Sequence, residues 1–366
     1  MTVFGSRPFR GTRAATLVAL VVIAFVAMLP AAQAQAARAP SRQHPSHPAN
    51  VASTQISSTA ARRARDYWTG RRMASAKRAD LQFAPRTQAR TMAARVAAPA
   101  PAGASPVTIN PATGTLPTKS ETLHSAITRP YTNRPDRLNG KVFFTSGGND
   151  YVCSGTVVNS NNQDMVDTAG HCVSDGAGNF HTNWVFVPAY SSGASGCTTR
   201  ASCYPYGKWT PRVLTTTVEW HLRANLSQDL GYAVLKARGG RHIVGYLGGQ
   251  GTAFNEPRVQ TWRDFGYPEE ASYNGYDQRM CTSGRLADDD PSTGPGPLTI
   301  GIRCSQTSGS SGGGWLIRVS AVSGLGYVNS HTGYKDAEGP SADPSRTFGP
   351  YHGDEALKLY NFANSL

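Results

Sequence analysis

The feature that most constrains this chain is a pair of short strings whose central histidine and serine are 140 residues apart. The first string is Thr168-Ala169-Gly170-His171-Cys172, and the second is Gly309-Ser310-Ser311-Gly312-Gly313. Between them, Asp229 opens an apolar run. A serine hydroxyl is a poor nucleophile at neutral pH, so an imidazole must take its proton and a carboxylate must orient that imidazole. The strings therefore predict a fold that brings His171, Asp229 and Ser311 into one nucleophilic site.

The order His171, Asp229, Ser311 resembles that of the chymotrypsin-like (trypsin-fold) serine peptidases over roughly residues 137–366. Two apolar strings before the histidine are similar to the family's paired strands, and Phe265-Gly266-Tyr267-Pro268 resembles a motif of the secreted bacterial, glutamyl-endopeptidase-like branch. The resemblance implies that His171 is the general base, Asp229 its orienting partner and Ser311 the nucleophile. It also implies an oxyanion hole formed by the N–H groups of Gly309 and Ser311.

Two positions bear on how closely the family's pattern applies. The residue before the nucleophile is Ser310, where the animal enzymes have an aspartate that pairs with a freed N-terminal amine. A serine carries no charge, so we predict that any prosegment acts by covering the site or by assisting folding. Asp167 is a second candidate for the orienting carboxylate. We favour Asp229, because Asp167 is too near His171 in sequence to match the family's geometry.

The length of 366 residues exceeds the roughly 200–250 that one trypsin-like domain needs, and the surplus is N-terminal. Residues 1–36 are predicted to be a secretory signal peptide, since arginines precede an apolar run that ends in Ala-x-Ala sites. An uncleaved membrane anchor is the alternative, but the run is short for a bilayer. Residues 37–120 are predicted to be a largely disordered prosegment and linker. Residues 121–366 are predicted to be the peptidase domain.

From residue 137 onward, short apolar runs alternate with Gly, Asn, Ser and Pro turns, which is the pattern of an all-β protein. The resemblance implies two six-stranded antiparallel β-barrels followed by a C-terminal helix. We expect that helix at 354–362, with two acidic residues at its N-terminus. The expected strands are 141–145, 152–159, 183–188, 212–219, 230–235, 260–265, 279–285, 298–304, 314–319 and 324–329.

Six cysteines fit an exported protein. Their order suggests the pairs Cys153–Cys172, Cys197–Cys203 and Cys281–Cys304, although six cysteines allow 15 connectivities. The first pair also matches the resembled family, where it holds the histidine turn against the barrel. Zinc binding is the alternative use of these cysteines. The chain has no Cys-x-x-Cys pair and no His-Glu-x-x-His, so we expect no metal.

The net charge of +13 belongs to the N-terminal part of the chain. Residues 1–120 hold 16 Lys/Arg and 2 Asp/Glu, whereas residues 121–366 hold 20 and 21. A nucleic-acid-binding protein needs a basic patch on its folded domain, and this balance does not support one. We expect a secreted monomer with protein or peptide substrates, no cofactor, no nucleic acid and no stable membrane association.

Substrate preference is the least constrained property. In the resembled family the specificity pocket is lined by residues before the nucleophile and by a later strand, which implies Ser305, Ser308 and His331 here. Ser305 stands where trypsin has an aspartate, so cleavage after Lys or Arg is not expected. In glutamyl endopeptidases a histidine with nearby hydroxyls binds the substrate carboxylate, which makes His331 with Ser308 a candidate for acidic specificity. The alternative is a pocket for apolar or small side chains.

We therefore predict a secreted serine endopeptidase, made as a zymogen, that works through an acyl-enzyme on Ser311. Two other functions stay open. One is a secreted binding protein that kept the fold but lost turnover, and it predicts no reaction with a serine-directed phosphonylating probe. The other is an esterase with the same triad, and it predicts ester turnover without cleavage of any protein.

Overall fold

The computed structural model describes most of the chain after residue 47. The described residues are 48–79, 104–116, 126–127, 133–192, 203–270, 272–291, 293–335, 343 and 345–366. They belong to one compact unit, Pro45–Leu366. The predicted signal peptide lies outside the described residues. Across the ranges that are described, no helix combines the length and the apolar character needed to cross a membrane.

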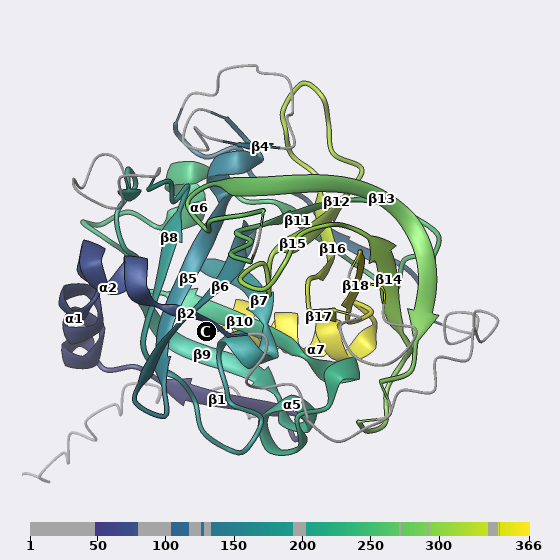
Figure 1. The fold of residues 1–366 in the computed structure, drawn as a ribbon, viewed down its shortest axis with the longest axis horizontal. Helices are drawn as coiled ribbons and strands as arrows, with labels where there is room; N and C mark the ends of the chain where they lie inside the picture. The colour runs from purple at the N-terminus through teal and green to yellow at the C-terminus, as the bar shows by residue number, and fades with distance from the viewer. Residues whose placement is uncertain are drawn as a thin grey trace, which may run out of the picture. The chain divides into compact units, whose positions relative to one another are not determined.

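The first half of this unit is a curled sheet built on six strands (Figure 1). These are β5 (Asn139–Ser146), β6 (Asn149–Val158), β7 (Met165–Ala169), β8 (Thr182–Pro188), β9 (Pro211–Thr217) and β10 (Leu230–Leu235). Two N-terminal strands, β1 (Val51–Gln55) and β2 (Lys77–Arg78), add to them. The order is β1-β9-β10-β7-β6-β5-β8, with β2 beside β6. A bridge between Phe186 and Trp209 links β8 to the segment before β9 and draws the ends of the sheet together.

The second half is a sheet in the order β17-β18-β14-β13-β12-β15-β16-β11-β3, with β4 beside β13. Its members are β3 (Val107–Ile109), β4 (Ala126–Ile127), β11 (Gly251–Phe254), β12 (Thr261–Gly266), β13 (Gln278–Asp289), β14 (Thr299–Arg303), β15 (Gly314–Ile317), β16 (Tyr327–His331), β17 (Tyr334–Lys335) and β18 (Arg346–Gly349). The predicted all-β fold is confirmed, although the sheets contain more than six strands each because N-terminal segments and short C-terminal strands join them.

Several helices accompany the two sheets (Figure 1). They are α1 (Ser58–Tyr67), α2 (Gly70–Ser75), α5 (Val218–Arg223), α6 (Ile243–Leu247) and α7 (Asp354–Asn364). The predicted C-terminal helix is confirmed as α7, which runs two residues further than expected. Its Tyr360 ring packs 6.0 Å from Tyr232 on β10 and 5.5 Å from Phe254 on β11, so α7 ties the two sheets together.

The N-terminal segment differs from its prediction. Residues 48–79 and 104–116 carry defined structure, although 37–120 were expected to be largely disordered. Strand β1 pairs antiparallel with β9 from Val51 to Gln55, and α1 packs on β8. Trp68 is fully buried, with its ring 5.2 Å from that of Phe143 and its indole N–H donating to the Asn183 carbonyl. The segment has too few apolar residues to fold alone, and the edges of an existing sheet order it. The domain boundaries themselves stay a prediction.

Candidate active site

The imidazole and the carboxylate meet where two paired strands end. His171 lies in the turn Gly170–Cys172 directly after β7, and Asp229 directly precedes β10. The strands are antiparallel with Ala169 opposite Leu230, so both residues are held at the same end of the sheet. Asp229 Oδ2 lies 2.7 Å from His171 Nδ1, and Asp229 Oδ1 accepts the His171 backbone N–H at 2.7 Å. One carboxylate therefore fixes both the ring and the backbone of His171.

A second histidine supports the first from behind. His181 lies 2.9 Å from the His171 carbonyl oxygen through its Nε2, and its ring stacks on Phe144 at 4.1 Å. Burial lowers the pKa of His181 to about 4, so the ring is neutral at physiological pH and its Nε2–H donates to that carbonyl. Trp220 lies edge-on to the His171 ring at 5.9 Å. Nothing in the sequence marked His181 as a support, because its contact depends on the tertiary fold.

Ser311 belongs to the loop between β14 and β15, and this loop is pressed against the first sheet. The Ser311 carbonyl oxygen accepts the Ser154 N–H at 2.7 Å and lies 3.6 Å from the Cys172 sulfur. Gly312 has a φ of +76°, and a Cβ there would lie 2.2 Å from the Thr168 hydroxyl oxygen. Only glycine permits this approach, so Gly312 lets Ser311 sit beside the turn that carries His171.

The predicted nucleophile and base are both enclosed. Ser311 is 0% and His171 3% exposed. The Ser311 hydroxyl makes no hydrogen bond to any residue that the structure describes. Catalytic hydrogen bonds often form only in the substrate complex, so an open Ser–His contact is compatible with a triad.

Hydrogen bonds hold the loop that leads to Ser311, and the residue directly before Ser311 forms a hydrogen bond and not an ion pair. Gly309 has a φ of +98°, and its carbonyl accepts the Ser154 hydroxyl at 2.9 Å. A Cβ at Gly309 would lie 2.6 Å from the Tyr267 carbonyl oxygen. Ser310 is buried and donates to the Gln306 side-chain oxygen at 2.9 Å. A neutral hydrogen bond therefore stands where the animal enzymes have an aspartate.

The structure contains two of the three expected disulfides, Cys153–Cys172 and Cys281–Cys304. The first joins β6 to the histidine turn. Cys203 is disulfide-bonded, and its expected partner Cys197 lies outside the described residues. Both cysteine-containing groups close enough to hold a metal use these disulfide sulfurs, which offer no thiolate. The remaining group of this kind among the described residues is Asp167, His331 and His352.

His331 is not placed to line a substrate pocket. It is fully buried at the end of β16, with Nδ1 3.0 Å from Asp167 Oδ1 and Nε2 2.9 Å from the Asp229 carbonyl oxygen. Burial lowers its pKa, but the neighbouring Asp167 and, to a smaller extent, Asp229 together outweigh burial and raise the pKa above the ordinary value. Both ring nitrogens are engaged, so neither faces a substrate carboxylate. Asp167, the second carboxylate candidate, contacts His331 and not His171.

The two predicted pocket serines lie on the loop before the nucleophile. The Ser305 hydroxyl is 2.8 Å from the Tyr273 hydroxyl, and Ser308 donates to Glu270 Oε1 at 2.6 Å. Sequence reasoning missed Glu270, which no motif marks. It also missed Asp264 on β12, which is fully buried and accepts the Thr332 hydroxyl at 3.2 Å. Burial raises the pKa of Asp264 to about 8.

No protein-family model and no curated protein matches the chain. Solved structures do. The protease Anisep from Arthrobacter nicotinovorans is 35% identical, with a TM-score of 0.55, and the match covers 66% of this chain and 98% of Anisep. The chain belongs to the chymotrypsin-like serine proteases. The protease is also similar to AL20, a thermostable serine protease from an extremophilic microorganism, with 36% identity and a TM-score of 0.54. This match covers 63% of the present chain and 97% of AL20. About a third of the chain has no counterpart in either structure.

Proposed function

We propose that the chain is the precursor of a secreted serine endopeptidase that cuts peptide bonds through a Ser311–His171–Asp229 triad. The observation that carries this proposal is the double contact of Asp229 with the ring and the backbone of His171. This contact keeps the proton on Nδ1, because only an Nδ1–H can donate to the carboxylate. The lone pair of Nε2 is then available to take the Ser311 proton.

The proposed reaction has two halves. Ser311 Oγ attacks the carbonyl carbon of the scissile bond while His171 Nε2 takes its proton. The N–H groups of Gly309 and Ser311 are proposed to bind the oxyanion of the tetrahedral intermediate. As the intermediate collapses, His171 gives its proton to the leaving amine, and an ester on Ser311 remains. Water then attacks this ester with His171 as base, and the acid product and Ser311 are released. The Asp229 carboxylate stabilises the imidazolium.

The two alternatives are separated from this proposal by one experiment. The intact mass of the secreted protein is measured before and after a fluorophosphonate probe, with casein cleavage assayed on the same sample. We expect one adduct on the wild type and none on Ser311→Ala. No adduct on a folded, fully processed wild type leaves only the binding protein. An adduct with ester turnover but no casein cleavage favours the esterase. Asp229→Asn should lower kcat by about 10⁴-fold.

We further propose that the N-terminal segment makes the precursor a zymogen by covering the site. Strand β2 runs parallel to β6, with Arg78 opposite Val152, and the Ala79 N–H donates to the Val152 carbonyl at 3.3 Å. Val152 is two residues before Ser154, which holds the nucleophile loop. Arg78 also forms an ion pair of 3.7 Å with Glu270. An open strand edge beside a nucleophile would accept an extended peptide, so β2 occupies the edge that a substrate needs.

A further inference from the structure

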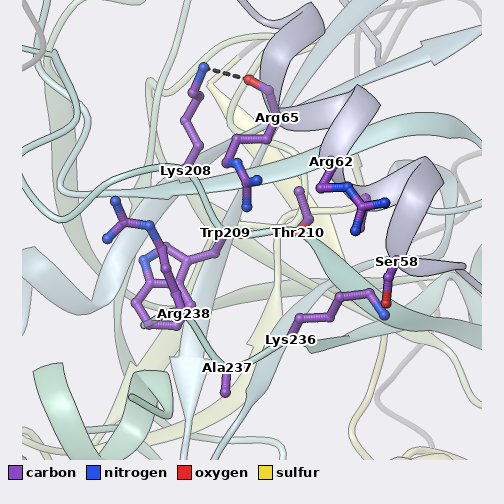
Figure 2. A pocket seen from close by; sticks show the side chains of 10 residues that line it. Ser58, Arg62, Arg65, Lys208, Trp209, Thr210, Lys236, Ala237 and Arg238 are labelled. Carbon is purple, nitrogen blue, oxygen red and sulfur yellow. Dashed lines mark hydrogen bonds between the residues drawn. The ribbon is translucent and has the colours of Figure 1, made fainter. Parts of the chain in front are cut away.

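A cavity lies between α1 and the first sheet (Figure 2). Its volume is about 130 Å³, whereas a single water needs about 10–15 Å³ by the same measure. Five of its ten lining residues are cationic and none is acidic. The cationic residues are Arg62, Arg65, Lys208, Lys236 and Arg238, and the others are Ser58, Ala61, Trp209, Thr210 and Ala237.

The cations reach the cavity from two separate parts of the chain. Ser58, Arg62 and Arg65 are spaced four and three residues apart, so they share one face of α1. Lys236 comes from the opposite wall, where its backbone N–H donates to the Thr210 carbonyl at 2.9 Å, at the point where β10 ends and β9 begins. Figure 2 shows the Arg65 and Arg238 side chains flanking the same opening, with Lys208 donating to the Arg65 carbonyl. Docking of the N-terminal segment therefore completes the cluster.

The cations of this cluster differ from two other cations of the docked segment, which pair with carboxylates. Arg72 lies 3.5 Å from Asp150, and Arg78 lies 3.7 Å from Glu270. Within the described ranges, no carboxylate forms an ion pair with Arg62, Arg65 or Lys236. Burial, and then the nearby Arg212, lower the pKa of Lys236. Like charges brought together across an interface oppose docking unless an anion lies between them.

We infer that this cavity binds an oxyanion of the phosphate or sulfate class, and that the bound anion holds the N-terminal segment on the protease. Arginine presents a planar fork of N–H donors that matches such oxygens, and lysine adds a compact charge. The Ser58 and Thr210 hydroxyls can donate as well. The anion is either free or displayed on a polymer, since both carry the same group.

The test uses the full chain with Ser311→Ala, so that no self-cleavage occurs. Its Tm is measured against inorganic phosphate, with sodium chloride at the same ionic strength as the reference. We expect phosphate to raise Tm by about 4 °C at a hundredfold excess over its Kd, from mass action on a chain of this size. An equal rise in chloride overturns the inference, because it shows screening without a site.

A charge variant locates the site. Arg65→Gln with Lys236→Gln should abolish the phosphate response. Arg72→Gln is the matched control, because it removes a charge of the same segment that contacts Asp150 outside the cavity, and it should keep the response. If the double variant responds like its parent, the inference is wrong. Polyphosphate at equal phosphate content identifies the source, because a lower half-saturation than inorganic phosphate favours a polymer and an equal value favours the free ion.

Discussion

Asp264 should make the protease less stable as pH rises, and its replacement should remove that loss. The carboxyl is fully buried on β12, with one hydroxyl, that of Thr332, donating to it at 3.2 Å. Burial disfavours the charged form and raises the pKa from 3.8 to about 8. Between these two values the folded protein keeps a proton that the unfolded chain has lost. Stability is therefore highest below pH 3.8 as far as this group is concerned, and it falls as pH rises towards 8.

The size of the effect follows from the width of this window. Each pKa unit corresponds to about 1.4 kcal/mol. At pH 6 the group costs about 3 kcal/mol of unfolding free energy, and at pH 8 and above about 5–6 kcal/mol. Asp264→Asn keeps the shape and an acceptor for Thr332 but is neutral at every pH. The difference in unfolding free energy between this variant and the parent should be near zero at pH 4, and by pH 8 the variant should be more stable by several kcal/mol.

The assay is urea unfolding from pH 4 to pH 9 in the Ser311→Ala background. Asp288→Asn is a control of opposite sign. Its carboxylate is held by Arg258 and Arg285, and despite burial these contacts lower its pKa, so the replacement should destabilise at neutral pH. A difference between Asp264→Asn and its parent that stays constant or shrinks with pH refutes the reasoning about Asp264.

Two further predictions concern parts of the molecule that support the site. Trp68→Ala removes the buried anchor of the N-terminal segment, so the precursor should react faster with a fluorophosphonate. Val322→Ala, at a side chain that is 91% exposed, is the control and should not change the rate. An unchanged rate in folded Trp68→Ala would show that the segment does not cover the site. In urea unfolding at a series of pH values, His181→Gln should lose about 3 kcal/mol less unfolding free energy than the parent between pH 6.5 and pH 4. The reason is that His181 stays neutral in the fold down to about pH 4, so stability is lost as pH falls from 6.5 to 4, and a loss as large as the parent's would contradict this.

Residues of the site that lie in short sequence motifs could be predicted from the sequence. Contacts that depend on the tertiary packing of distant segments could not. Asp229 directly precedes a strand that was expected at 230–235, whereas β7, which directly precedes the turn of His171, was missing from the expected strands, so His171 was found from its local string alone. His331 was expected to line a substrate pocket, but the structure buries its ring, and both ring nitrogens contact groups of the first sheet. Its contact with Asp167 joins two sheets and leaves no trace in either string.

The prediction that the N-terminal segment is disordered was wrong for a related reason. Its composition indicates disorder, and composition describes what a segment does alone. Strand β1 instead fills the open edge of β9, and Trp68 enters a space lined by aromatic rings of the first sheet. Both partners are more than 70 residues away in the chain, so no local window contains the information that orders the segment.

Two features, Ser310 and the N-terminal segment, indicate how the activity of the precursor is controlled. In the animal enzymes a charge before the nucleophile waits for a new N-terminus to complete the loop. Here Ser310 is already hydrogen-bonded to Gln306, so the loop needs no incoming amine. Any control must then come from outside the loop. The contact that reaches it is Arg78 on Glu270, whose carboxylate accepts the Ser308 hydroxyl. We therefore expect that removal of the segment, and not the creation of a new N-terminus, frees the site.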